Sequence, residues 1–175
     1  MRVYLIGFMG AGKTTLGQEL ARKLNVSFCD TDLLVCRDTG YESISDLIAS
    51  RGMDFFRLAE RDALRKTGRD CGVVATGGGT PCYFDNLEWM LQSGVVVYVC
   101  MDVDALFLRL SNTNLATRPL LAGKNENELR MYIYDTLAAR EQYYLRAHIT
   151  YEPLRETLDH LIYKINHFHL SHIPS

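Results

Sequence analysis

The sequence has no apolar run that approaches eighteen residues, so no segment is expected to cross a membrane. It also has no excess of basic residues: 19 Lys and Arg stand against 21 Asp and Glu, which gives a formal net charge of −2. This balance gives no sign of a surface for nucleic acids. The first expected strand starts at Arg2, which leaves no room for a signal peptide. We therefore expect a soluble, cytoplasmic protein that binds neither membranes nor nucleic acids.

Paired cysteines are missing as well. The five cysteines are odd in number and include no C-x-x-C pair; they stand at positions 29, 36, 71, 82 and 100. We expect neither a disulfide framework nor a zinc site, and we predict small buried thiols in a reducing compartment. Cys82 has no histidine near it in the sequence, so it is expected to be a bystander and not a nucleophile.

Internal repeats, low-complexity segments and linkers are absent. The 175 residues, 47% of them hydrophobic, therefore predict one domain with a proper core. We place this domain at residues 1–166. Residues 167–175 carry three histidines and are expected to form a frayed tail, with a metal site as the alternative.

What the sequence does contain is a glycine-rich phosphate loop at residues 7–15, Gly-Phe-Met-Gly-Ala-Gly-Lys-Thr-Thr. It follows an apolar run at 3–6 and leads into a helical pattern at 16–24, the context that G-x-x-x-x-G-K-[ST] requires. Glycines let backbone N–H groups surround an anion at a helix start. The pattern would arise by chance in roughly one chain of this length in two hundred. The predicted ATP-binding residues of the loop are Gly10, Ala11, Gly12, Lys13, Thr14 and Thr15.

Two aspartates end the second expected strand, at 26–32. Asp30 and Asp32 are two residues apart and therefore share a side of the strand end, where open α/β sheets bind their ligands. With Lys13 at the β- and γ-phosphates, Thr14 and Asp30 are expected to hold Mg²⁺, and Asp32 is expected to face the acceptor. The alternative is that Asp32 caps a helix that starts at residue 33.

Three consecutive glycines, Gly77, Gly78 and Gly79, follow the third expected strand at 72–76. Such a triplet permits the backbone to approach a ligand closely. The alternative is a flexible turn.

An arginine on an amphipathic segment is a further candidate. Arg57 stands three residues before Glu60 and four before Arg61, so the three side chains share a helix face. The alternative for Arg57 is a solvated surface arginine in a local ion pair.

The segment at 111–125 is polar and unperiodic, and it presents Arg118. A mobile loop that carries an arginine is typical of the lid of a phosphoryl-transfer enzyme, although ordinary surface loops share this composition.

Strands alternate with helices along the chain, which predicts an α/β fold with a parallel sheet. The later expected strands are 95–100 and 149–151. The later expected helices are 33–39, 43–50, 55–64, 87–91, 103–110, 126–147 and 154–165.

Five motifs and one arginine occur in a fixed order: the phosphate loop at 7–15, Asp-Thr-Asp at 30–32, Phe-Arg-x-x-Glu at 56–60, Gly-Gly-Gly at 77–79, Arg-Pro-Leu-Leu at 118–121 and Arg140. This set resembles the shikimate kinase family over residues 1 to about 147. The resemblance implies a three-layer αβα P-loop kinase with a five-stranded parallel sheet of order 2-3-1-4-5. It also implies substrate-binding helices at about 33–62 and a lid at about 111–125.

The activity implied by the resemblance is the phosphorylation of the 3-hydroxyl of shikimate by ATP with Mg²⁺, on the route to chorismate and the aromatic amino acids. By position, Asp32 would activate the hydroxyl, and Arg57 and Arg140 would clamp the shikimate carboxylate. The implied catalytic residues are Lys13, Asp32 and Arg118. The implied substrate-binding residues are Asp32, Arg57, Gly77, Gly78, Gly79 and Arg140. The family suggests a monomer.

The adenine side is less well defined. Arg109 falls near the family's adenine-side arginine. The sequence after residue 147 departs from the family pattern, so Pro153 and Arg155 are the candidates for the adenine contact expected from that segment. Two other functions compete: another small-molecule P-loop kinase, such as gluconate kinase, and a catalytically idle nucleotide-binding module. The absence of an Asn-Lys-x-Asp segment argues against a GTPase switch.

Overall fold

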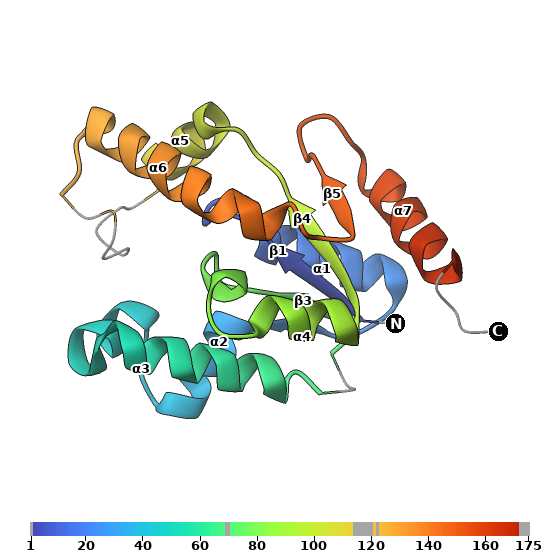
Figure 1. Cartoon of the computed structure of the whole chain (residues 1–175), viewed down its shortest axis with the longest axis horizontal. Helices are drawn as coiled ribbons and strands as arrows, with labels where there is room; N and C mark the ends of the chain where they lie inside the picture. The colour runs from blue at the N-terminus through green and yellow to red at the C-terminus, as the bar shows by residue number, and fades with distance from the viewer. Residues whose placement is uncertain (1, 69–70, 114–120, 122, 172–175) are drawn as a thin grey trace.

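The computed structural model describes residues 2–68, 71–113, 121 and 123–171 (Figure 1). At its centre is a five-stranded, all-parallel sheet in the order β2-β3-β1-β4-β5. The strands are β1 (Val3–Ile6), β2 (Phe28–Asp30), β3 (Val73–Ala75), β4 (Val95–Val99) and β5 (Ile149–Tyr151). The predicted fold class and strand order are confirmed.

Helices connect successive strands, and one more helix follows the last strand. They are α1 (Lys13–Leu24), α2 (Thr31–Thr39), α3 (Ile44–Lys66), the 3₁₀ turn η1 (Thr80–Cys82), α4 (Asn86–Ser93), α5 (Val103–Ser111), α6 (Glu126–Tyr144) and α7 (Leu158–Ser171). Two predicted helices are joined in α3, which kinks at Gly52 where φ is 81°. None of these helices is both long and apolar enough to span a bilayer.

The end of the chain differs from the prediction. Helix α7 starts later than the expected residue 154 and continues through Ser171, so the first part of the expected tail is helical. Among the described residues, no group of three His, Cys, Asp or Glu side chains could hold a metal ion. The third histidine of the expected tail, at position 172, lies outside the described residues.

Alternating side chains of the sheet enter two separate cores, which makes the three layers. Val3, Leu5, Val73 and Val97 pack with residues of α1, α5, α6 and α7. Tyr4, Ile6, Val74, Val96 and Tyr98 face the opposite side and pack with α4, with the end of α3 and with the end of α6. This arrangement follows from the period of two along each strand.

Helices α2 and α3 have a small core of their own, away from the sheet. It consists of Val35, Leu47, Phe56 and Ala63 with partly buried neighbours. Figure 1 shows this pair as a lobe below the sheet, while α5 and α6 form a second lobe above it. The carboxyl ends of the strands open between these lobes.

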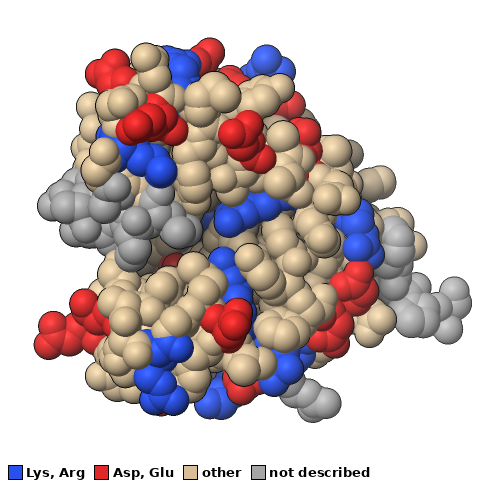
Figure 2. All heavy atoms as spheres, turned by 60° about the vertical axis from the view of Figure 1, so that its left-hand side comes forward, with Lys and Arg blue, Asp and Glu red and all other residues tan. Residues whose placement is uncertain are grey.

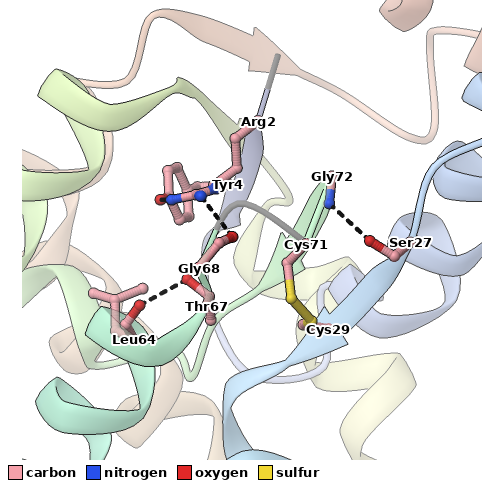
Figure 3. The surroundings of a disulfide bond; sticks show 9 residues. All are labelled: Arg2, Tyr4, Ser27, Cys29, Leu64, Thr67, Gly68, Cys71 and Gly72. Carbon is pink, nitrogen blue, oxygen red and sulfur yellow. Dashed lines mark hydrogen bonds between the residues drawn. A yellow bond between two sulfur atoms is a disulfide. The ribbon is translucent and has the colours of Figure 1, made fainter.

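A disulfide corrects the expectation for the cysteines. Cys29 on β2 and Cys71 just before β3 are bonded, with a Cα–Cα distance of 6.0 Å (Figure 3). Because β2 and β3 are parallel neighbours, residues 42 positions apart in the sequence come to lie side by side. Spacing in the sequence carries no signal of this pairing, which depends on the strand order.

We expect the bond to be visible in a thiol titration. The remaining cysteines, Cys36, Cys82 and Cys100, are free. Denatured protein should therefore release three thiols without reductant and five with it, whereas a count of five in both samples would contradict the bond.

The disulfide should also stabilise the fold. A Cys71→Ser variant should lower the free energy of unfolding by about 2–4 kcal/mol, because the segment between Cys29 and Cys71 is then no longer closed into a loop in the unfolded chain.

Candidate active site

The phosphate loop joins β1 to α1, which begins at Lys13. Gly12 precedes the helix with a φ of 92°, a left-handed value that side chains disfavour. Lys13 is only 8% exposed, and its ammonium donates to the carbonyls of Gly7 and Phe8, both at 2.8 Å. The backbone of the loop thus holds this charge inside a cavity of about 490 Å³ that Thr14, Thr15 and Asp30 also line.

Asp30 ends β2 and caps α2. Its Oδ1 accepts the backbone N–H of Asp32 at 3.0 Å, and its Oδ2 accepts the Thr14 hydroxyl at 2.7 Å. The sequence alternative had Asp32 as the cap, but α2 begins earlier, at Thr31, and the cap is therefore Asp30.

Thr14 and Asp30 fit a magnesium ion. They place a hydroxyl and a carboxylate next to each other beside the phosphate loop. Mg²⁺ is usually held by one or two protein oxygens together with substrate phosphates and water, not by a complete protein cage. Two hard oxygen donors at this point satisfy that requirement.

Asp32 lies between the two halves of the site. Burial, aided by the nearby charges of Glu60 and Asp30, raises its pKa to about 6, although Lys13 and Arg57 act in the opposite direction. Its buried Oδ1 accepts no hydrogen bond from any described residue. A carboxylate with this pKa and a free oxygen can accept a proton near neutral pH.

Arg57 is held in place before any ligand arrives. Its Nη1 donates to Glu60 Oε2 at 2.7 Å, and the Thr80 hydroxyl donates to the other oxygen, Oε1, at 2.6 Å. The ring centroid of Tyr83 lies 4.2 Å from the guanidinium carbon. The ion pair that the sequence suggested for Arg57 is present. The suggestion that Arg57 lies at the solvated surface is wrong, because Arg57 is 7% exposed and Glu60 is fully buried.

The glycine triplet is a close-packed part of this wall. The N–H of Gly77 donates to the Thr31 hydroxyl at 3.2 Å. A Cβ on Gly79 would lie 2.7 Å from Arg57 Nη2, and one on Gly77 would collide with Glu60 Oε1. The glycine triplet is therefore not merely a flexible turn.

Arg140 comes from the opposite lobe, on α6. Its guanidinium carbon lies 5.9 Å from the ring centroid of Phe8, and it lines a second cavity, of about 180 Å³, together with Arg57 and Asp32. The apolar side of this cavity is formed by Ile44, Ile48, Met53 and Phe56. Figure 2 shows the molecule hollowed between the two lobes, with Lys and Arg atoms on both sides of the hollow.

The two cavities share one wall. Met9, Asp32, Gly77 and Gly78 line both of them. A group bound in the larger cavity and a group bound in the smaller one would thus meet beside the Asp32 carboxylate, which is the arrangement that group transfer requires.

The remaining predicted residues behave differently. Arg109 donates to the Ala11 carbonyl at 3.0 Å and lines the phosphate-loop cavity. Arg155 is 78% exposed, pairs with Glu152 and lines a separate cavity beside Tyr98, not that of the phosphate loop. Arg118 and most of the expected lid lie outside the described residues.

Sequence reasoning underrated two residues of the site. It offered Glu60 only as the partner in a surface ion pair, whereas Glu60 fixes Arg57 through a buried one. Tyr144 is fully buried and donates to the Gly78 carbonyl at 2.5 Å, but in the sequence it is one of several tyrosines on α6.

Known proteins resemble the chain over nearly its whole length. The family model for shikimate kinase matches residues 9–166. A shikimate kinase of Parabacteroides distasonis is 41% identical over 152 residues, which cover 86% of this chain and 87% of that protein. One of Azobacteroides pseudotrichonymphae is 39% identical, over 92% of this chain and 95% of that protein.

Solved structures agree with this result. The shikimate kinase of Acinetobacter baumannii, in complex with shikimate, superposes with a TM-score of 0.84 at 35% identity, covering 99% of this chain and 95% of that one. The shikimate kinase of Bacteroides thetaiotaomicron gives 0.83 at 34% identity and covers 99% of both chains. The chain belongs to the shikimate kinase family.

Proposed function

We propose that this protein transfers the γ-phosphoryl group of ATP to the 3-hydroxyl of shikimate, on the route to chorismate and the aromatic amino acids. The observation that carries the proposal is the small cavity, of about 180 Å³, that Arg57, Arg140 and Asp32 line together. The family of the chain, and the shikimate bound to the Acinetobacter baumannii neighbour, support this acceptor.

On the donor side, Lys13 would neutralise charge on the β- and γ-phosphates, and Arg109 would lie near the adenine side. Thr14 and Asp30 would hold Mg²⁺, which supplies charge neutralisation at the phosphate oxygens. Arg118 would approach the phosphates with the lid.

On the acceptor side, the guanidinium groups of Arg57 and Arg140 would orient the shikimate carboxylate. Asp32 would accept the hydroxyl proton as the hydroxyl oxygen forms its bond to the γ-phosphorus. The bond from that phosphorus to the β–γ bridging oxygen breaks, and ADP leaves. Positioning supplies much of the rate in such a transfer.

We propose a monomer, as the family suggests. Because ATP is supplied inside the cell, we place the reaction in the cytoplasm.

The proposal predicts the effect of replacing either clamp arginine by lysine. Arg57→Lys and Arg140→Lys keep the charge but lose the planar fork, so each should raise the KM for shikimate about tenfold or more. The KM for ATP should change little. Steady-state kinetics with ADP release as the readout measure both constants.

Arg61→Lys is the matched control, since Arg61 lies one turn further along α3 and pairs with the exposed Asp62. It should leave both KM values unchanged. An unchanged shikimate KM in both clamp variants would remove the assignment of the acceptor. The same assay with gluconate, and with no acceptor, separates the competing kinase and the idle binding module.

A further inference from the structure

We propose that the hydroxyl of Tyr144 is a positioning group that couples Arg140 to the glycine triplet, and that it thereby sets the affinity for the acceptor. This inference rests on the proposed function only for the identity of the acceptor. Tyr144 touches neither substrate in this assignment and acts through its two neighbours.

The first contact joins segments that are far apart in the sequence. Tyr144 is the last residue of α6, and its hydroxyl donates to the carbonyl of Gly78, 66 residues away, at 2.5 Å. Gly78 belongs to the wall shared by the two cavities. The bond therefore fixes the backbone at the point where donor and acceptor would meet.

The second contact is with Arg140, one helical turn before Tyr144 on the same helix. Burial raises the pKa of Tyr144, while the nearby guanidinium of Arg140, within reach of the phenol oxygen, acts in the opposite direction. The phenol thus stays neutral, so its oxygen can accept from Arg140 while its proton is donated to Gly78. A Cβ on Gly78 would lie 3.5 Å from Arg140 Nη1, which places all three groups together.

The ring of Tyr144 is itself anchored. It stacks on Tyr98 of β4, with ring centroids 5.1 Å apart and an interplanar angle of 27°, and both side chains are buried. This stacking therefore fixes the position of the Tyr144 hydroxyl relative to the sheet. When all members of a buried hydrogen-bond network are paired, the network restricts the motion of the side chains that it joins.

Tyr144→Phe is the test, because it removes one oxygen and keeps the stacked ring. We expect the KM for shikimate to rise about three- to tenfold, the value of one neutral hydrogen bond, with the KM for ATP and kcat within about twofold of wild type. Tyr98→Phe is the matched control: it removes the other hydroxyl of the same stacked pair and keeps the Tyr144 hydroxyl that bonds Gly78. It should leave all three constants unchanged.

A second measurement does not depend on the acceptor. Phenylglyoxal modifies accessible arginines, and peptide mapping gives the rate at each position. Tyr144→Phe should raise the rate at Arg140 at least about threefold, by loss of one hydrogen bond, and should leave Arg61 unchanged. The melting temperature of each variant is recorded, and any variant that melts early is assayed at 10 °C.

The outcomes separate the two proposals. A wild-type shikimate KM together with a wild-type rate at Arg140 overturns the role of Tyr144. A raised KM with an unchanged Arg140 rate overturns the coupling to Arg140. A wild-type enzyme that does not use shikimate overturns the proposed function, and the Arg140 rate then still decides the role of Tyr144.

Discussion

A Lys13→Ala variant is expected to lose phosphoryl transfer by about 10³-fold while it keeps its fold. The ammonium is the buried cation of the phosphate-loop cavity, where negative charge develops during transfer. A preorganised donor at such a point contributes about 10²–10³ in kcat. The lost hydrogen bonds end on two loop carbonyls, which water can reach once the side chain is shortened.

The measurement is kcat with saturating ATP and shikimate, alongside the melting temperature. Lys23→Ala is the matched control, because Lys23 lies near the end of the same helix, is half-exposed and pairs with Asp159. It should retain wild-type turnover. Near-normal turnover of Lys13→Ala would contradict the assignment of the phosphate loop as the site that binds the phosphoryl donor.

Asp32→Asn is expected to lower kcat by about 10²-fold or more, as removal of a general base does, with ATP binding nearly intact. In the wild type, kcat should fall as the pH is lowered through about 6, because burial raises the pKa of Asp32 to that value and the protonated form cannot accept a proton. This limb of the pH profile should be missing in the variant.

The same substitution should stabilise the protein above pH 6. The pKa of Asp32 is raised from 3.8 to about 6 in the fold, so between these values the unfolded chain releases its proton while the folded chain keeps it. The wild type therefore loses stability as the pH rises through this window. The melting temperature of Asp32→Asn should exceed that of wild type by a margin that grows from pH 4 to pH 6 and then stays constant.

Asp30→Asn is the matched variant, because it changes the other carboxylate of the strand end. It should weaken the dependence of activity on Mg²⁺, since Asp30 and Thr14 form the hard-oxygen pair. If both variants lost only affinity for magnesium, the division of labour between the two carboxylates would be wrong.

Much of the fold could be predicted because its signals are local. The valine-rich run at 95–99 is buried on both faces, and the glycine loop precedes a helix; each can be recognised within ten residues. Asp30 could be assigned to the ligand-binding edge because parallel order fixes where a strand end lies. The expected strand at 26–32 was too long, however: Asp32 lies in the first turn of α2, so the period of two does not explain its place. The strand order itself came from the resemblance.

The rest depends on contacts between distant segments. The bond between Cys29 and Cys71 requires β2 and β3 to be neighbours, and the role of Tyr144 requires α6 to meet the glycine triplet. For Arg57, the sequence posed an ion pair and a place in the acceptor site as alternatives. The structure shows that the two are compatible, since Glu60 pairs with Arg57 at the wall of the smaller cavity.

The wall shared by the two cavities also bears on inhibitor design. Met9, Asp32, Gly77 and Gly78 line both cavities, so two groups bound in them would lie close enough for a short linker to join. Joining a diphosphate mimic to a carboxylate-bearing ring would make the second binding event intramolecular. Its affinity would then gain from effective concentration, as in bivalent ligands, without any new contact. A side chain at Gly77 would collide with Glu60 and crowd Asp32, so resistance by substitution there would also damage the enzyme's own site.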